Sequence, residues 1–269
     1  MKKRILSTIL ALMIAMPAFA SLAVSPTKID INATKIKTNY TTTAIEVKGD
    51  SKTPMRFRVS TGYFKVNEKG ELVFLDKSND PNDMSKRLKY IPSEFTVAQG
   101  KTQKLRLNIP NLNTLPDGES RAMVYIEDVN VKEMSYDTGV DGVGAQLIIK
   151  TRVGIPVYIE HGNAVRVADF DYAKITKQKD GYYLEAKIKD TGNSKVRCKG
   201  AVQISQGKKL VSETRIDDFV VAPGNYNIIR TKINTNKIEA GNYTARVVIT
   251  YKDINEKIKN IKQDIELNI

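Results

Sequence analysis

Apolar and polar residues alternate along most of this chain. The alternation recurs in short segments, among them 44–48, 55–60, 103–109, 122–126, 182–188, 201–205 and 243–251. A period of two residues predicts β-strands with one buried face. Turn residues such as Gly70, Gly100 and Gly224 separate the segments, and no convincing helical period interrupts them. The pattern therefore predicts an all-β chain.

The longest alternating segment covers residues 142–159, GVGAQLIIKTRVGIPVYI. Its odd-numbered positions from Val143 to Ile159 are apolar except at Thr151. Read as one strand, the segment would run about 55 Å, whereas an ordinary strand has about 5–6 residues. Such a strand extends beyond its own sheet, so some of its apolar side chains are left to contact another molecule.

Strands at this spacing predict two immunoglobulin-like β-sandwich domains. The polar stretch 160–163 is the expected boundary, which divides the chain into 1–20, 21–159 and 160–269. Because the linker is short, we expect the domains to be set at a fixed angle with a cleft between them. The polar segment 76–87 is expected to be a solvated loop, and 130–141 a mobile one.

The first 20 residues resemble a secretory signal peptide. Lys2, Lys3 and Arg4 precede an apolar run and an Ala18-Phe19-Ala20 cleavage site, which predicts a periplasmic protein. The rest holds no second long apolar run, so no membrane span is expected. The net charge is +13, and +10 without those three basic residues. Export and the scatter of the lysines argue against nucleic acid and favour acidic partners or anionic membrane.

Catalytic chemistry has little support in the composition. Cys198 and His161 are the only residues of their types, so neither a disulfide, a zinc site nor a histidine-activated nucleophile is expected. Asp-Thr-Gly at 137–139 and 190–192 suggests an aspartic protease, but the preceding residues are not strongly apolar and both triplets fit turns. In 76–87, Pro81 and Arg87 stand where a calcium loop needs glycine and glutamate. We expect no metal, no cofactor and no enzymatic activity.

Three blocks of sequence resemble the PapD-like periplasmic pilus chaperones of the chaperone–usher pathway. They are LAVSPTKI at 22–29, the segments 90–95, 99–107 and 115–121, and the long segment 142–159. Together these blocks span most of the first domain, and their order and spacing are similar to those of the family. The chain resembles a divergent or alternative type of chaperone within it. The second domain resembles the family only in its class of fold.

The resemblance implies a chaperone that donates a β-strand to pilus subunits and delivers them to an outer-membrane usher. It implies that Val143, Ala145, Leu147 and Ile149 enter the subunit, and that basic residues bind the subunit's C-terminal carboxylate. The family has one basic anchor residue in its opening strand and another in its long strand. Lys28 stands at the first of these positions, but Gly154 stands at the second. Arg152 is the expected substitute, and Arg121 the next. We also expect the free protein to be a dimer, or a monomer in which the loop 130–141 covers the strand, since an apolar edge strand attracts other edges.

Two other functions fit the sequence less well. A secreted two-domain adhesin or pilus structural component would account for the signal peptide and the strands, but would leave the long segment without a purpose. An exported hydrolase would rest on the Asp-Thr-Gly triplets. Co-purification of a smaller subunit would separate a chaperone from an adhesin.

Overall fold

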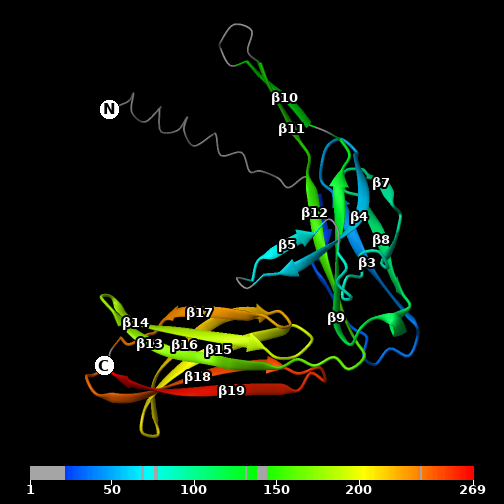
Figure 1. The fold of residues 1–269 in the computed structure, drawn as a ribbon. Coiled ribbons are helices and arrows are strands. Elements are labelled where there is room, and N and C mark those ends of the chain that lie inside the picture. The colour runs from blue at the N-terminus through cyan, green and yellow to red at the C-terminus, as the bar shows by residue number, and fades with distance from the viewer. Residues whose placement is uncertain (1–21, 68–69, 76–77, 131, 138–143, 237) are drawn as a thin grey trace, which may run out of the picture.

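The computed structural model describes residues 22–269, except 68–69, 76–77, 131, 138–143 and 237, and it describes no side chains between 131 and 149 (Figure 1). In this part of the chain, all elements but one short 3₁₀ helix, η1 (Leu112–Thr114), are β-strands. They form two domains, and the strands of the second run across the direction of β9 and β12 in the first (Figure 1).

The first domain is a sandwich of two sheets. One sheet has the order β1 (Leu22–Ser25), β3 (Tyr40–Gly49), β8 (Thr102–Pro110), β6 (Lys89–Ile91). The other has the order β2 (Ile29–Asn32), β12 (Arg152–His161), β9 (Gly118–Asp128), β4 (Met55–Val66), β5 (Leu72–Leu75), and β7 (Glu94–Val97) pairs with the start of β4. These orders correspond to those of an immunoglobulin sandwich in which the first strand is shared between the sheets.

The second domain has the same kind of topology with seven strands. One sheet has the order β13 (Ala168–Gln178), β14 (Gly181–Asp190), β17 (Tyr226–Lys232). The other has the order β16 (Lys209–Val221), β15 (Val196–Gln206), β18 (Asn242–Lys252), β19 (Ile258–Asn268). The prediction of two immunoglobulin-like sandwiches set at an angle is confirmed.

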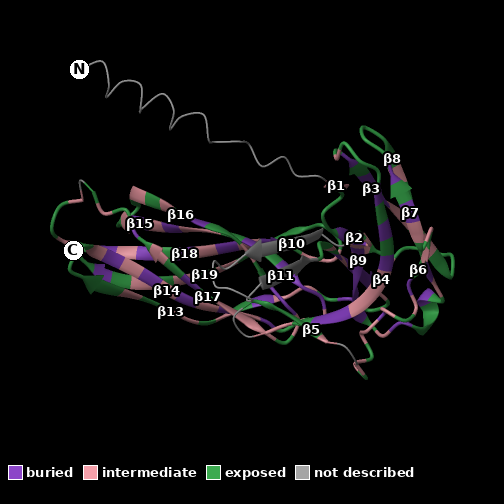
Figure 2. Ribbon diagram, turned by 90° about the horizontal axis from the view of Figure 1, so that it is seen from above, coloured by how far each residue is buried: buried purple, intermediate pink, exposed green. Residues whose placement is uncertain are grey.

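Each sandwich has its own apolar core (Figure 2). In the first, Ile45, Phe57 and Leu105 are at most 1% exposed, and in the second Leu184 and Val247 are fully buried. Cys198 belongs to the second core, where burial, aided by the charge of Asp190, raises the pKa of its thiol to about 12. A thiol that stays protonated is a poor nucleophile, so Cys198 packs as a small apolar residue.

The prediction of one unbroken strand over 142–159 is wrong. β11 (Gly144–Ile149) ends before Lys150, and β12 begins at Arg152. The break coincides with the end of β9 at Asp128, whose amide donates a hydrogen bond to the carbonyl oxygen of Thr151 at 2.9 Å. Before Arg152, the described chain has no neighbouring strand in this sheet. β11 pairs instead with β10 (Lys132–Asp137) in a separate two-stranded hairpin that projects from the first domain (Figure 1).

Two loop expectations need correction in part. The stretch 130–141 contains β10. The described residues 78–87 form a loop, as expected, but this loop is fixed to β9, because the Arg121 amide donates to the Asn82 carbonyl at 2.9 Å and the Met84 amide donates to the Arg121 carbonyl at 3.1 Å. Met84 is fully buried in the first core, so this polar segment is held by one apolar side chain that its composition conceals.

Candidate functional site

The outer face of the sheet β2-β12-β9-β4 gathers most of the predicted anchor residues. In β12 the odd-numbered Ile155, Val157 and Ile159 are at most 1% exposed, so the even-numbered residues face outward. The register sets Arg152 beside Glu127 and Tyr158 between Arg121 and Asp30. Strand pairing thus collects charges from three separate parts of the chain on one surface.

Lys28 and Arg152 both lie on this face, and both are accessible. Lys28 precedes β2 and is level with Pro156, because Ile29 pairs with Val157. Its ammonium is 3.9 Å from an Asp30 carboxylate oxygen, and half of its side chain is exposed. Arg152 is four residues back along β12, about 13 Å at the usual rise of a strand. The two predicted anchors therefore share a surface but are not direct neighbours.

An aromatic platform supports Arg152. Its guanidinium lies 4.2 Å from the centre of the Tyr125 ring. Glycines on both neighbouring strands make room for that ring, because a Cβ atom at Gly62 would be 2.8 Å from the ring and one at Gly154 would be 3.4 Å from it. At Gly154 an added Cβ would also be 3.0 Å from the sulfur of Met123. A side chain at position 154 would therefore require Met123 to shift by a few tenths of an ångström.

Arg121 is less accessible than the other two candidates. It is 8% exposed, and its Nε atom is 3.8 Å from a carboxylate oxygen of Glu119. That Nε is buried without a hydrogen bond among the described atoms. Arg121 is therefore enclosed within the first domain, beside Glu119 and the segment that carries Asn82 and Met84.

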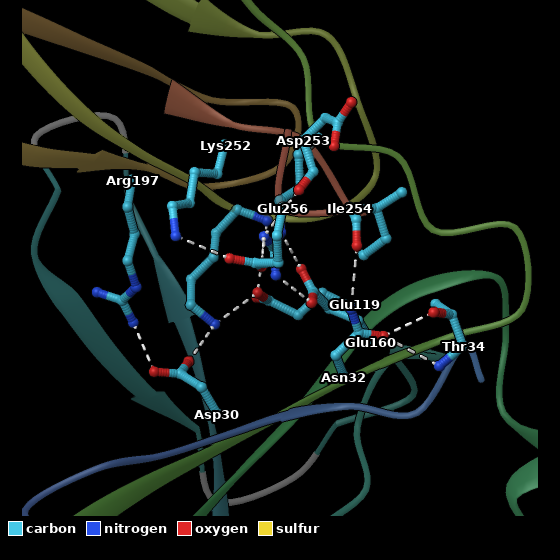
Figure 3. Close-up of polar contacts among 12 residues, drawn as sticks. Asp30, Asn32, Thr34, Glu119, Glu160, Arg197, Lys252, Asp253, Ile254 and Glu256 are labelled. Carbon is cyan, nitrogen blue, oxygen red and sulfur yellow. Dashed lines mark hydrogen bonds and ion pairs between the residues drawn. The ribbon is translucent and has the colours of Figure 1, made fainter. Parts of the chain in front are cut away.

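A buried lysine joins the two domains at this end of the face. Lys195 immediately precedes β15 and is 9% exposed. Its Nζ atom is 2.8 Å from Glu119 Oε2 and 2.9 Å from Asp30 Oδ1, two residues that Figure 3 labels. The same atom is 3.3 Å from the centre of the Tyr158 ring. Charges removed from water need such close partners. Lys195 thus links the second domain to β2, β9 and β12 of the first.

Other contacts hold the junction on both sides of Lys195. Arg166 donates to Glu160 at 2.7 Å and to Glu256 at 3.1 Å, and the hydrogen bond to Glu160 is the main reason that its pKa is raised (Figure 3). The Asn225 side chain donates to the carbonyl oxygen of Val66 at 2.6 Å. These bonds connect several loops of each domain, so the angle between the domains is held at more than one point.

A cleft of about 580 Å³ lies between the domains beside Lys195. Its lining residues from the first domain include Asp30, Asn32, Tyr158 and Glu160, and those from the second include Arg166, Arg197, Lys199, Tyr251, Lys252, Glu256 and Ile258. The second domain supplies all the basic residues of the lining. The sequence interpretation missed them, although basic residues alternate at 195, 197 and 199, which indicates one charged face of a strand.

The two Asp-Thr-Gly triplets do not form a catalytic pair. Asp137 ends β10 of the first domain and Asp190 ends β14 of the second, while Thr138 and Gly139 lie outside the described residues. Asp190 accepts a hydrogen bond from the Gly192 amide at 2.8 Å, which is the expected turn. Among the described residues no cluster of three or more His, Cys, Asp or Glu side chains could hold a metal ion. The described chain also has no helix both long and apolar enough to span a membrane.

Asp190 has an unusual environment for a carboxylate. It is 3% exposed, and its Oδ2 atom has no hydrogen-bond partner among the described atoms. Burial raises its pKa to about 7, the charge of Glu119 adds to the effect, and the Gly192 amide opposes it. The native protein therefore favours a protonated Asp190 over a range in which the unfolded chain ionises it.

Asp190→Asn should stabilise the protein above pH 7 and have little effect below about pH 4. Between these values the native state binds more protons than the unfolded state, so this group makes the free energy of unfolding fall as the pH rises. The full difference should approach roughly 4 kcal/mol, at about 1.4 kcal/mol per pKa unit. Denaturant unfolding of both proteins from pH 4 to 8 measures it, with exposed Asp217→Asn as the control. A difference that does not vary with pH would contradict the assignment.

Comparisons with known proteins give structural matches only. No family model and no curated protein matches the sequence. A chaperone–tip adhesin complex of CFA/I fimbriae biogenesis is 14% identical, with 89% of this chain and 98% of that chain covered and a TM-score of 0.47. The YadV chaperone is 12% identical (92% and 100% covered, TM-score 0.45). The CsuC–CsuE pre-assembly complex of archaic Csu pili from Acinetobacter baumannii is 16% identical (90% and 98%, TM-score 0.42). All three are structures of chaperones, two of them together with a tip subunit.

Proposed function

We propose that this protein is a periplasmic chaperone that binds pilus subunits by donating a β-strand and delivers them to an outer-membrane usher. The observation that carries the proposal is the hairpin of β10 and β11. β11 is paired with β10 along one edge and has no other strand partner in the described part of the chain. A strand placed in this way, with Ala145, Leu147 and Ile149 alternating along it, is suited to join another protein's sheet.

Strand donation solves a specific problem of the client. A sandwich that lacks one strand has an open core and unpaired edges, which promote aggregation. Main-chain hydrogen bonds from β11 would supply affinity, and its alternate apolar side chains would fill the groove. Val143, the fourth predicted donor residue, lies outside the described residues. The adhesin alternative is not favoured, because it gives this hairpin no role.

We further propose that Lys28 and Arg152 bind the client's C-terminal carboxylate. Both lie on the outer face of the sheet and both are exposed, which supports the assignment. Both side chains are long enough to converge on a ligand between them. Arg121 remains the next candidate, but its side chain is largely buried beside Glu119 and would first have to become exposed.

Lys28→Ala should weaken subunit binding by about tenfold to a hundredfold. A charge-assisted hydrogen bond is worth roughly 1.5–3 kcal/mol, and each 1.4 kcal/mol is a factor of ten in affinity. Titration of a pilus subunit encoded by a neighbouring gene measures the change. Lys48→Ala is a matched control, since Lys48 is similarly exposed and also has a weak contact to an aspartate, at 3.8 Å. Wild-type affinity in the double variant Lys28→Ala, Arg152→Ala would place the anchor elsewhere.

The free protein is also proposed to self-associate through the unpaired edge of β11. Such an edge presents donors and acceptors to any other strand. Light scattering should then find dimers of the free protein and one-to-one complexes with the subunit. A monomer at all concentrations would exclude this pairing.

A further inference from the structure

The strand β5 presents an apolar surface at the edge of the first domain. Leu72, Val73 and Phe74 are 42%, 41% and 55% exposed, and they form the only run of exposed large apolar residues in the part of the chain that the structure describes. Single exposed apolar residues are normal for a soluble protein, whereas a contiguous apolar patch is typical of a docking surface. β5 is also the last strand of its sheet, with no described strand beyond it.

Strand pairing places part of this patch on the outer face of the sheet. Phe64 of β4 pairs with Phe74, so the two side chains point to the same face, and alternation adds Leu72 to it. The Phe64 ring is fully buried, and its centre is 5.6 Å from that of Tyr158, an outward-facing residue of β12. Leu72 and Phe74 therefore lie on the face that carries Arg152.

Aromatic rings make the patch continuous with Arg152. The centre of the Phe74 ring is 6.3 Å from that of Tyr125, and the guanidinium of Arg152 lies over the same Tyr125 ring. Gly62, on the strand between these two rings, leaves space for Tyr125. We call Leu72, Phe74 and Tyr125 the β5 surface. It is an apolar area that directly adjoins one of the proposed anchors.

A client held by β11 is close enough to reach the β5 surface. Two residues separate β11 from β12, so Ile149 is about 10 Å from Arg152 at the usual rise of a strand. A folded domain of about 100 residues has a radius of gyration of about 13 Å, which exceeds this separation. The body of a bound subunit can therefore extend from the hairpin to the outer face of the sheet.

We infer that the β5 surface binds an apolar patch on the folded body of the client subunit, at a distance from the donated strand and from the C-terminal anchor. The inference rests on the proposed function and deepens it. Leu72, Phe74 and Tyr125 carry no charge, so they favour aliphatic or aromatic side chains of the partner, and burial of these groups would supply affinity. A second contact also fixes the orientation of the subunit relative to β11. The β5 surface thus helps to determine which subunits are accepted.

The double variant Leu72→Ser, Phe74→Ser, called the β5 variant, should bind a pilus subunit encoded by a neighbouring gene about tenfold to a hundredfold more weakly than the wild type. Both side chains are exposed in the free protein, so its denaturant unfolding should change little. Leu210→Ser with Val220→Ser is the matched control, because these β16 residues are 55% and 39% exposed. The control should keep the affinity of the wild type. Wild-type affinity in the β5 variant would overturn the inference.

Photo-crosslinking tests the contact without removal of the apolar surface, and it also decides the matter if the β5 variant folds poorly. A photoreactive phenylalanine analogue at position 74 should crosslink to the bound subunit, whereas the same analogue at position 210 should not. A crosslink from position 74 to a second copy of this chain, or none to the bound subunit, would overturn the inference. Binding to phosphatidylglycerol vesicles that only the β5 variant loses, with wild-type affinity for the subunit, would assign the surface to a membrane instead.

Failure of this inference is distinguishable from failure of the proposed function. If the wild type captures the subunit and the β5 variant captures it equally well, the β5 contact is wrong and strand donation stands. If the wild type captures no subunit, strand donation is wrong and the β5 contact falls with it.

Discussion

Replacement of Leu147 and Ile149 together by glutamate should abolish capture of a pilus subunit. Both positions lie on the same side of β11, the side predicted to enter the client. Inside an apolar groove each unpaired carboxylate would cost several kcal/mol, and the binding contributed by the apolar side chains would be lost as well. Protection of the subunit from proteolysis measures capture. Far-ultraviolet circular dichroism should barely change, because the β10–β11 hairpin is a separate sheet from those of both sandwiches.

A double variant on the other side of the same strand is the matched control. Gln146→Glu with Ile148→Glu adds the same two carboxylates to β11 at even-numbered positions. It should retain much more of the capture than the odd-numbered variant does. Equal loss of capture in the two variants would show that the added negative charge on β11 prevents capture, whichever side of the strand carries it. Full capture by the odd-numbered variant would show that these side chains do not enter the client.

Lys195→Met should open or destabilise the junction between the domains. The substitution leaves Glu119, which is 2% exposed, without its 2.8 Å partner and with only the 3.8 Å contact to Arg121. Removal of one partner of a buried ion pair typically costs about 3–5 kcal/mol, because the remaining charge stays buried and poorly compensated. Denaturant unfolding should therefore begin at lower concentration, and small-angle X-ray scattering should show a larger radius of gyration before the domains unfold.

Two further variants test the reason for this effect. Addition of Glu119→Gln to Lys195→Met removes the uncompensated charge and should restore most of the stability. Lys232→Met, which breaks an exposed 2.8 Å pair with Asp180, should cost no more than about 1 kcal/mol. If Lys195→Met keeps the stability and radius of the wild type, this lysine does not hold the domains together.

The strands were predictable because their burial follows a local pattern. In β14 the residues alternate between buried and half-buried from Tyr182 to Asp190, as the sequence alternates. The break between β11 and β12 was not predictable in this way. The alternation fails at Thr151, which lies in the break, but one polar residue does not distinguish a break from a continuous strand. The position of the break depends on where the neighbouring β9 ends.

The site was predictable only in part. Lys28 and Arg152 stand out because they lie in or beside strands of the first domain that resemble a known family. The contact between Asp30 and Arg197 joins residues that are 167 positions apart, across two domains. Local alternation of charge at 195, 197 and 199 indicates an exposed basic face, but only the angle between the domains brings that face to Asp30.

Hydrogen exchange in β11, measured with and without the subunit, tests strand donation most directly. The account predicts that the amides of residues 144–149 become strongly protected when a pilus subunit binds, because the client's strands pair with this edge. Protection of β12 or of the cleft alone, with 144–149 exchanging as fast as in the free protein, would contradict it.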